Sequence, residues 1–141
     1  MKTSKNKFGI ILFLIFFSIM NINAQSLLSQ LNRGQRIDKL IKISNSILET
    51  GDNALMKDQL KKPEVIQYSG FEVTSKMVEV VTPGDAFYKA KIGSIFYIVS
   101  YPVIDSYRYL YEEDFGIRVY IWDDGTPFQI WYGGSGIKAS Y

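Results

Sequence analysis

The spacing of apolar residues changes at Pro63, and this change is the strongest constraint on the fold. Over residues 26–50, apolar side chains recur at three- and four-residue steps, which is the period of an amphipathic helix. After Pro63, β-branched and aromatic residues dominate in short runs separated by turn residues, which is typical of strands. A helical part followed by a run of strands predicts an α+β domain. We expect an N-terminal amphipathic helix packed on a five- to six-stranded antiparallel sheet.

The helical stripe is interpreted as a core face. Gly51 stands where a helix commonly ends, and Gly34 is a position where the long helix could break or begin. Asp52 or Asn53 could cap a short second helix that ends before Pro63. A small domain usually buries such a stripe against its sheet, although the stripe could instead bind a partner. Its members are Ile37, Leu40, Ile41, Ser44, Ile47 and Leu48, extended backward by Leu27, Leu28 and Leu31.

The dipeptide Asp124-Gly125 predicts the last hairpin, because it suits a two-residue type I′ turn. Pairing outward from this turn places Arg118 opposite Trp131 and Ile121 opposite Phe128. A slip by one residue would mix the two faces, so this register is favoured. One face then receives Ile117, Val119, Ile121, Phe128, Ile130 and Tyr132, and the other receives Arg118, Tyr120, Trp122 and Trp131. Pro127 lacks an N–H group and therefore predicts that the last strand lies at an edge.

Further strands are predicted between Pro63 and the last hairpin. Gly93-Ser94 suggests a turn that pairs residues 86–92 with residues 95–101. Residues 95–104 are apolar at both parities, which predicts a central strand. Strands are also expected at 65–68, at 71–81 with a bulge near Met77, and at 106–111. A turn is expected at 82–85 and a solvated loop at 112–116.

Residues 1–24 have the pattern of a cleavable signal peptide. Lys2, Lys5 and Lys7 precede an apolar run over residues 8–22, and Ala24 follows as a small residue near a cleavage site. The run is shorter than the roughly 20 residues of a membrane-spanning helix. An uncleaved anchor is the alternative. We expect residues 25–141 to form a single α+β domain that a bacterium exports to its periplasm or secretes, with membrane contact only through the export segment.

The composition excludes several chemistries. The chain has no cysteine and no histidine, so disulfides, thiolate nucleophiles and Ser-His-Asp or Cys-His catalysis are absent. Of the 16 basic residues, three are the lysines of the signal segment, which leaves 13 against 14 acidic residues in residues 25–141. This net charge of −1 gives no electrostatic basis for nucleic-acid binding.

The remaining catalytic patterns are weak. Ser135-x-x-Lys138 matches an acylation motif but lacks the helix start and the downstream motifs that the chemistry needs. The acidic residues at 112–114 and 123–124 lack the spacing of a calcium loop and are interpreted as loop and turn residues. No glycine-rich phosphate loop follows a strand. We therefore predict no catalytic residue, no metal site and no cofactor.

Aromatic residues provide the most informative signal. Four of the 21 aromatic residues lie in the signal segment, so 17 remain in residues 25–141, among them all ten tyrosines. Rigid rings beside an arginine are typical of contact surfaces. In the alternative, other elements cover these rings and Arg118 lies over Trp131. The predicted binding residues are Arg118, Tyr120, Trp122 and Trp131 on the hairpin, with Tyr107 and Tyr109 from a row that also includes Tyr111.

These features predict an exported, non-enzymatic binding module, such as an inhibitor, an immunity-type protein or an envelope adaptor. Its expected partner is an envelope protein or a glycan, bound by the aromatic sheet face. The alternative is a small-ligand-binding protein or a carboxylate-dependent enzyme with a pocket between helix and sheet. A structural envelope component that joins a neighbour through its edge strand is a third interpretation.

Overall fold

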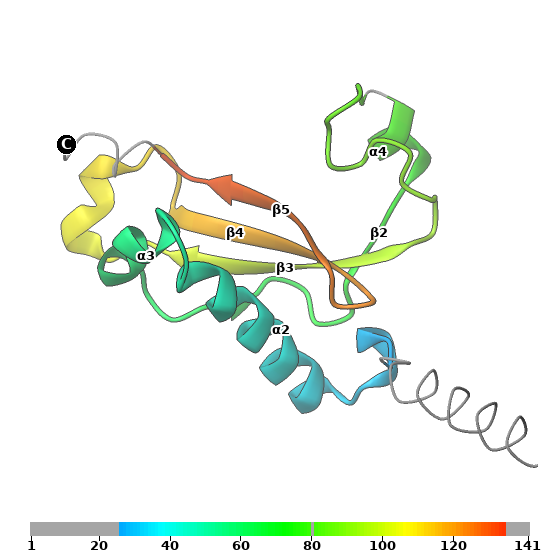
Figure 1. Ribbon diagram of the computed structural model, residues 1–141, viewed down its shortest axis with the longest axis horizontal. Helices are drawn as coiled ribbons and strands as arrows, with labels where there is room; N and C mark the ends of the chain where they lie inside the picture. Colours follow the sequence, from blue (N-terminus) through cyan, green and yellow to red (C-terminus); the bar gives the residue numbers. More distant parts are fainter. Residues whose placement is uncertain (1–25, 80, 135–141) are drawn as a thin grey trace, which may run out of the picture.

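The computed structural model describes residues 26–79 and 81–134 of the 141-residue chain. The predicted signal peptide, Val80 and the Ser135-x-x-Lys138 motif lie outside the described residues. Within these ranges the chain is α+β, with a five-stranded antiparallel sheet and a long helix that runs along one face of it (Figure 1). The predicted fold class is therefore confirmed.

The helical part begins with the 3₁₀ turn η1 (Leu28–Gln30) and the long helix α2 (Arg33–Leu48). Asn32 caps α2 because its side chain accepts from the Gln35 N–H at 2.9 Å, while the Gln35 side chain returns to the Asn32 N–H. The helix thus begins beside Gly34 rather than at residue 26. Gly51 has a φ of +59° just beyond the helix end. The predicted second helix is present as α3 (Asn53–Met56), continued by η2 (Lys57–Gln59).

The sheet consists of β1 (Glu64–Val65), β2 (Phe71–Glu72), β3 (Ile95–Pro102), β4 (Phe115–Trp122) and β5 (Pro127–Tyr132). Its order is β1-β3-β4-β5, and β2 pairs with β3 beyond the β1 pairing. The strand over 95–102 is central, as the doubly apolar pattern predicts. β5 is an edge strand, which confirms the inference from Pro127.

The predicted register of the last hairpin is confirmed over most of its length. Arg118 pairs with Trp131, Val119 with Ile130 and Tyr120 with Gln129, but Ile121 pairs with Pro127. The loop has three residues rather than two, because the N–H of Gly125 bonds the Trp122 carbonyl at 2.8 Å and Gly125 has a φ of +88°. The register shift turns Phe128 to the aromatic side. The prediction that Phe128 joins the aliphatic face is wrong for this reason.

The predicted hairpin at Gly93-Ser94 is also wrong. Residues 86–92 form turns, and Gly93 is the third residue of a turn closed by the Ser94 N–H on the Lys91 carbonyl at 3.1 Å. The edges of β3 are already occupied, by β4 on one side and by β1 and β2 on the other. The turn at 82–85 is confirmed by the Asp85 N–H, which bonds the Thr82 carbonyl at 3.0 Å.

Of the remaining predicted strands, two are cut short and one does not form. The strand expected at 65–68 is present only as β1 (Glu64–Val65). The segment predicted as a strand over 71–81 contains only β2, followed by the short helix α4 (Ser75–Glu79), so the parity change near Met77 reflects a helical turn rather than a bulge. Residues predicted as a strand at 106–111 form the 3₁₀ helix η3 (Asp105–Leu110). Arg108 closes this helix by donating to the Tyr111 carbonyl at 2.7 Å. Loop residues 112–114 are exposed, as predicted, but Phe115 and Gly116, predicted to belong to the same loop, are buried in β4 (Phe115–Trp122).

The core lies between α2 and the sheet, so the helical stripe packs on strands, as predicted. Two members of the predicted stripe differ: Ile43, rather than Ile41, packs against this core, and Leu27 is exposed. The fully buried members on the sheet come from the inward parity of β3 and β4. They are Tyr97, Val99, Ile117, Val119 and Ile121, which face Leu40 and Leu48 of α2.

Tyr101 makes the core sensitive to alkaline pH. Its ring is buried and its hydroxyl donates to Asn45 Oδ1 at 2.8 Å. Burial raises its pKa from 10.0 to about 12. In the unfolded chain Tyr101 ionises first, so the free energy of unfolding falls as the pH rises from about 10 through about 12.

We expect Tyr101→Phe to lower the free energy of unfolding by about 1 kcal/mol near neutral pH, because one hydrogen bond is lost. The difference from the native protein should shrink above about pH 11, because the variant cannot ionise at this position. Urea unfolding of the native protein and the variant, near neutral pH and above about pH 11, measures the difference in the free energy of unfolding under each condition. Tyr109→Phe, at an exposed position, is the matched control. A difference that stays constant with pH would contradict the assignment.

Candidate functional site

The sheet face opposite α2, here called the aromatic face, carries most of the predicted binding residues. Alternate residues of a strand point to opposite faces of the sheet, and this face carries the residues that do not point into the core. Cross-strand register sets its side chains in rows, because paired residues on neighbouring strands point to the same side. Its members on the three long strands are Phe96, Ile98, Ser100, Arg118, Tyr120, Trp122, Phe128, Gln129 and Trp131.

One part of this face is covered by the protein itself. Residues 71–94 leave the sheet and return to it, and they bring Phe71 and Phe87 onto Phe96 at ring distances of 5.5 and 5.2 Å. Trp122 stacks on Phe128 at 3.9 Å. We call these five residues the closed cluster. Phe96 is 2% exposed at its centre. Trp122 is therefore held in an intramolecular cluster, as in the alternative interpretation of the aromatic residues.

The other part of the face is only partly covered, because Ser100 is buried and Ile98, Arg118 and Tyr120 are half-buried, while residues at its two sides are exposed. The first row crosses the sheet from Ile66, whose N–H bonds the Ile98 carbonyl at 3.0 Å, through Ile98 and Tyr120 to Gln129. The second row crosses it through Glu64, Ser100, Arg118 and Trp131. We call these two rows the open patch. Trp131 is 51% exposed and Ile66 is 47% exposed.

Contacts within the open patch hold its rings and its cation in place. The rings of Tyr120 and Trp131 lie 6.2 Å apart with a tilt of 39°. Arg118 does not lie over Trp131: its guanidinium covers the Phe115 ring at 3.9 Å, and its Nε donates to Ser100 Oγ at 3.3 Å. Burial raises the pKa of the Tyr120 hydroxyl, and the charge of Arg118 offsets part of this rise. The patch thus presents a neutral phenol, an indole and a fixed cation.

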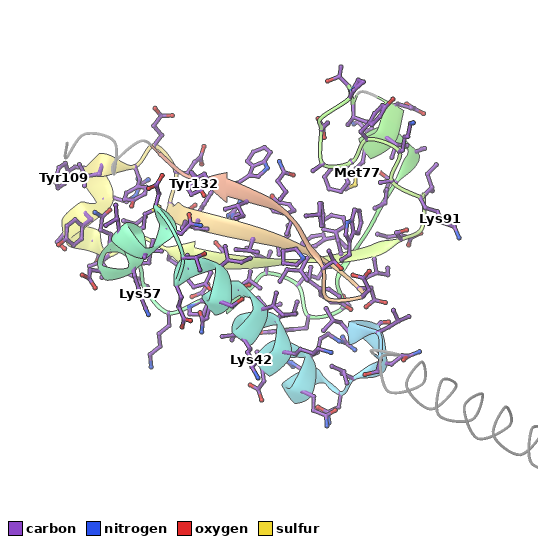
Figure 2. The ribbon with its side chains drawn as sticks, in the orientation of Figure 1. Lys42, Lys57, Met77, Lys91, Tyr109 and Tyr132 are labelled. Carbon is purple, nitrogen blue, oxygen red and sulfur yellow. The ribbon has the colours of Figure 1, made fainter. Side chains whose placement is uncertain are left out.

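Tyr107 and Tyr109 lie elsewhere. Both belong to η3, at the end of the molecule opposite α4, where Figure 2 places Tyr109 far from Met77. Tyr109 is 80% exposed, Tyr107 packs partly on the core, and Tyr111 is buried. A 3₁₀ helix turns successive odd residues to different sides, so the single-parity row does not form. Of the predicted binding residues, the structure brings together Arg118, Tyr120 and Trp131.

The other half of the open patch was not predicted from the sequence. Ile98 and Ser100 have the right parity on β3, but a long connection separates β3 from β4, and no tight turn fixes their register. Ile66 lies one residue beyond a two-residue strand. The only signal in the sequence was the alternation along β3, which places residues 98 and 100 on the face opposite the core.

Polar groups outside the face are engaged in holding the chain together. Asp123 accepts from the N–H and Oγ of Ser29, at 2.7 and 2.6 Å, and from the Tyr97 hydroxyl at 3.3 Å. Arg36 donates to four backbone carbonyls, those of Leu28, Ser29, Leu31 and Tyr68. The Asp123 bonds fasten the start of the described chain to the β4–β5 turn, and the Arg36 bonds join the same segment to α2 and to Tyr68. We assign Asp123 and Arg36 a structural role.

The described ranges hold no group of three or more acidic side chains placed to bind a metal ion. An open depression of about 480 Å³ lies beside the β4–β5 turn, but Asp123 on its wall is already bonded to Ser29. Among residues 26–79 and 81–134, no helix has the length and apolarity that crossing a membrane requires.

Comparisons with known proteins add no relative to this picture. No family model, no curated protein and no solved structure matches the chain.

Proposed function

We propose that the protein is an exported binding module that holds an envelope protein on the open patch. The observation that carries this proposal is the division of the aromatic face. The chain covers the closed cluster with its own residues 71–94 but leaves Trp131, Tyr120 and Arg118 beside Ile66 and Ile98. Tryptophan, tyrosine and arginine contribute most of the energy in many protein interfaces.

The composition of the open patch favours a protein over a glycan. Two isoleucines extend the aromatic row, and the interior of a protein interface is apolar with few charges. Sugar rings stack best on flat, accessible rings flanked by hydrogen-bonding groups. Here Tyr120 and Trp131 are tilted by 39° and form no single flat platform, although Gln129 lies opposite Tyr120 and Arg118 lies opposite Trp131. We therefore commit to a protein partner.

The geometry gives less support to a ligand pocket or a carboxylate-dependent enzyme. The space between α2 and the sheet is filled by side chains with no solvent exposure, including Leu40, Tyr97 and Ile117. Every aspartate and glutamate of the described ranges is at least partly exposed. A catalytic carboxyl group with a raised pKa usually needs burial in a cleft.

Trp131 provides the sharpest test. We expect Trp131→Ala to weaken partner binding about tenfold or more, because an exposed aromatic anchor commonly contributes over 1 kcal/mol. A photo-activatable phenylalanine analogue placed at position 131 in the producing cell should form a covalent adduct with one envelope protein. Mass spectrometry identifies this protein, and titration of the purified pair gives the affinity change.

The matched control is Tyr109, which is more exposed but lies on η3, away from the patch. The analogue at position 109 and the variant Tyr109→Ala should give no adduct and no loss of affinity. Equal adducts at both positions, or unchanged affinity in a folded Trp131→Ala variant, would refute the open patch. Retention on immobilised envelope polysaccharide without a protein adduct would refute the protein partner in favour of a glycan.

Export is part of the same proposal and rests on the N-terminal pattern of lysines, apolar run and Ala24. We expect the protein recovered from the periplasm or the medium to begin at Gln25. Intact mass measurement of the recovered protein gives its first residue directly. A protein that retains residues 1–24 and sediments with membranes would favour the uncleaved anchor instead.

A further inference from the structure

The two edges of the sheet differ in how they are protected. At one edge, β1 and β2 have two residues each, carry Glu64 and Glu72, and are separated by a turn at Gly70 with a φ of +79°. Short, charged and interrupted edges resist pairing with another chain. Natural sheets use such devices to prevent unwanted association. The first edge is therefore blunted.

The edge formed by β5 lacks most of these devices. It has six residues, and no charged side chain occurs anywhere over residues 125–137. Within the described parts of the chain, no backbone group of residues 127–132 makes a hydrogen bond outside the ladder with β4. Figure 1 shows β5 along the free side of the sheet. Only Pro127 and the register shift beside it interrupt this edge.

The pairing with β4 determines which groups of β5 point outward. The Gly133 N–H bonds the Gly116 carbonyl at 3.0 Å, so Gly133 faces β4. Ladder bonds alternate along an antiparallel strand, and the N–H and C=O of Ile130 and Tyr132 therefore point away from the sheet. The side chains of Trp131 and Tyr132 are 51% and 52% exposed and lie on opposite faces of this strand.

We infer that β5 pairs with β5 of a second copy of this chain, antiparallel and about a two-fold axis through Trp131. Ile130 of each copy then lies opposite Tyr132 of the other, and these two pairs exchange backbone hydrogen bonds. The distorted end at Pro127 stays outside the pairing. A second copy suits this edge because an uncharged strand meets itself without like-charge repulsion. The two sheets become continuous, and both open patches lie on one side.

The absence of native cysteine permits a direct test of the register. In Trp131→Cys, the two sulfurs face each other across the axis at a non-hydrogen-bonded pair, where Cα atoms lie about 4.5 Å apart. That distance suits a disulfide. We expect mild oxidation of the purified protein to give a disulfide-linked dimer. Tyr109→Cys, an exposed control on η3, should stay largely monomeric at the same concentration.

The second measurement is sedimentation equilibrium of the native protein and two variants. Tyr132→Pro removes an outward N–H without breaking the ladder to β4, whereas Tyr132→Ala removes the same ring and keeps that N–H. We expect the native protein to dimerise and Tyr132→Pro to dimerise at least about tenfold more weakly than Tyr132→Ala, since two backbone bonds are lost across the axis. Circular dichroism verifies that both variants fold.

Two outcomes would overturn the inference. A native protein that stays monomeric across the accessible concentration range excludes self-pairing and leaves the edge to a segment of another protein. A dimer that is equally stable in Tyr132→Pro and Tyr132→Ala, with equal oxidation of Trp131→Cys and Tyr109→Cys, places the contact elsewhere. At position 131 an adduct with a second copy supports the pairing and an adduct with another protein supports the open patch, so the two proposals can fail separately.

Discussion

Replacing Gly133 by alanine is expected to lower the free energy of unfolding by more than about 3 kcal/mol, or to prevent folding. An added Cβ would lie 1.7 Å from the backbone oxygen of Phe115. The backbone cannot move aside easily, because the Gly133 N–H bonds Gly116 and its carbonyl accepts from Glu112 and Glu113 at 3.0 and 2.9 Å. Chemical denaturation followed by tryptophan fluorescence measures the loss.

Gly34→Ala is the matched control for this prediction. In the first turn of α2, an added Cβ meets only Asn32 Oδ1, at an ordinary contact distance of 3.6 Å. Alanine favours helix over glycine, so we expect the free energy of unfolding to stay unchanged or to rise by up to about 1 kcal/mol. If Gly133→Ala lowered the free energy of unfolding no more than Gly34→Ala does, Gly133 would not lie as close to the Phe115 backbone as the structure places it.

The parts of the fold that sequence reasoning predicts are those set by local pattern. The stripe of α2, the cap position near Gly51 and the pairing of Arg118 with Trp131 depend on neighbours in sequence or on one tight turn. The predicted register of this hairpin also placed Arg118, Tyr120 and Trp131 on one face, as the structure does. The prediction was wrong at Phe128 because the register shifts between Tyr120 and Ile121, and this local shift turns Phe128 to the aromatic side while the pairing beyond it stays as predicted.

The remaining errors arise where distant contacts override local propensity. Residues 86–92 read as a strand, yet the edges of β3 are taken by other strands, and Phe87 instead packs on Phe96 and Phe128. Val73 exchanges backbone bonds with the turn at Gly93 and Ser94, which draws the β2 segment back to the sheet. These backbone bonds join residues about twenty positions apart, so no periodic pattern in the sequence indicates them. Strand propensity is weak beside such contacts.

The aromatic face thus serves two physical roles that the sequence does not separate. Phe96, at the centre of the closed cluster, loses nearly all of its solvent contact on folding, its four ring neighbours lose part of theirs, and removal of the central ring leaves a cavity. In the open patch Trp131 is 51% exposed and Tyr120 is half-buried, so the surface that they still expose remains available for a partner. The expected signature is a split between stability and binding, with a different residue dominating each.

Phe96→Ala tests this division between stability and binding, because we expect it to cause a large loss of stability. Phe96 is the centre of the closed cluster, with rings of Phe71, Phe87, Tyr120, Trp122 and Phe128 between 5.2 and 6.3 Å away. We expect the free energy of unfolding to fall by about 3–5 kcal/mol. Residues 71–94 should also exchange their amide hydrogens faster, because Phe71 and Phe87 hold this segment on the sheet.

Trp131→Ala is the counterpart on the open patch. Its ring keeps 51% of its exposure and touches one aromatic neighbour, Tyr120, so we expect a stability loss below about 1 kcal/mol together with the loss of partner binding. Denaturation and hydrogen exchange on both variants measure the difference. If the two substitutions destabilised the protein equally, the division of the aromatic face into a closed and an open part would fail. Both side chains are aromatic and lie on the same face of one sheet. A difference between the two losses in the free energy of unfolding would therefore come mostly from their surroundings.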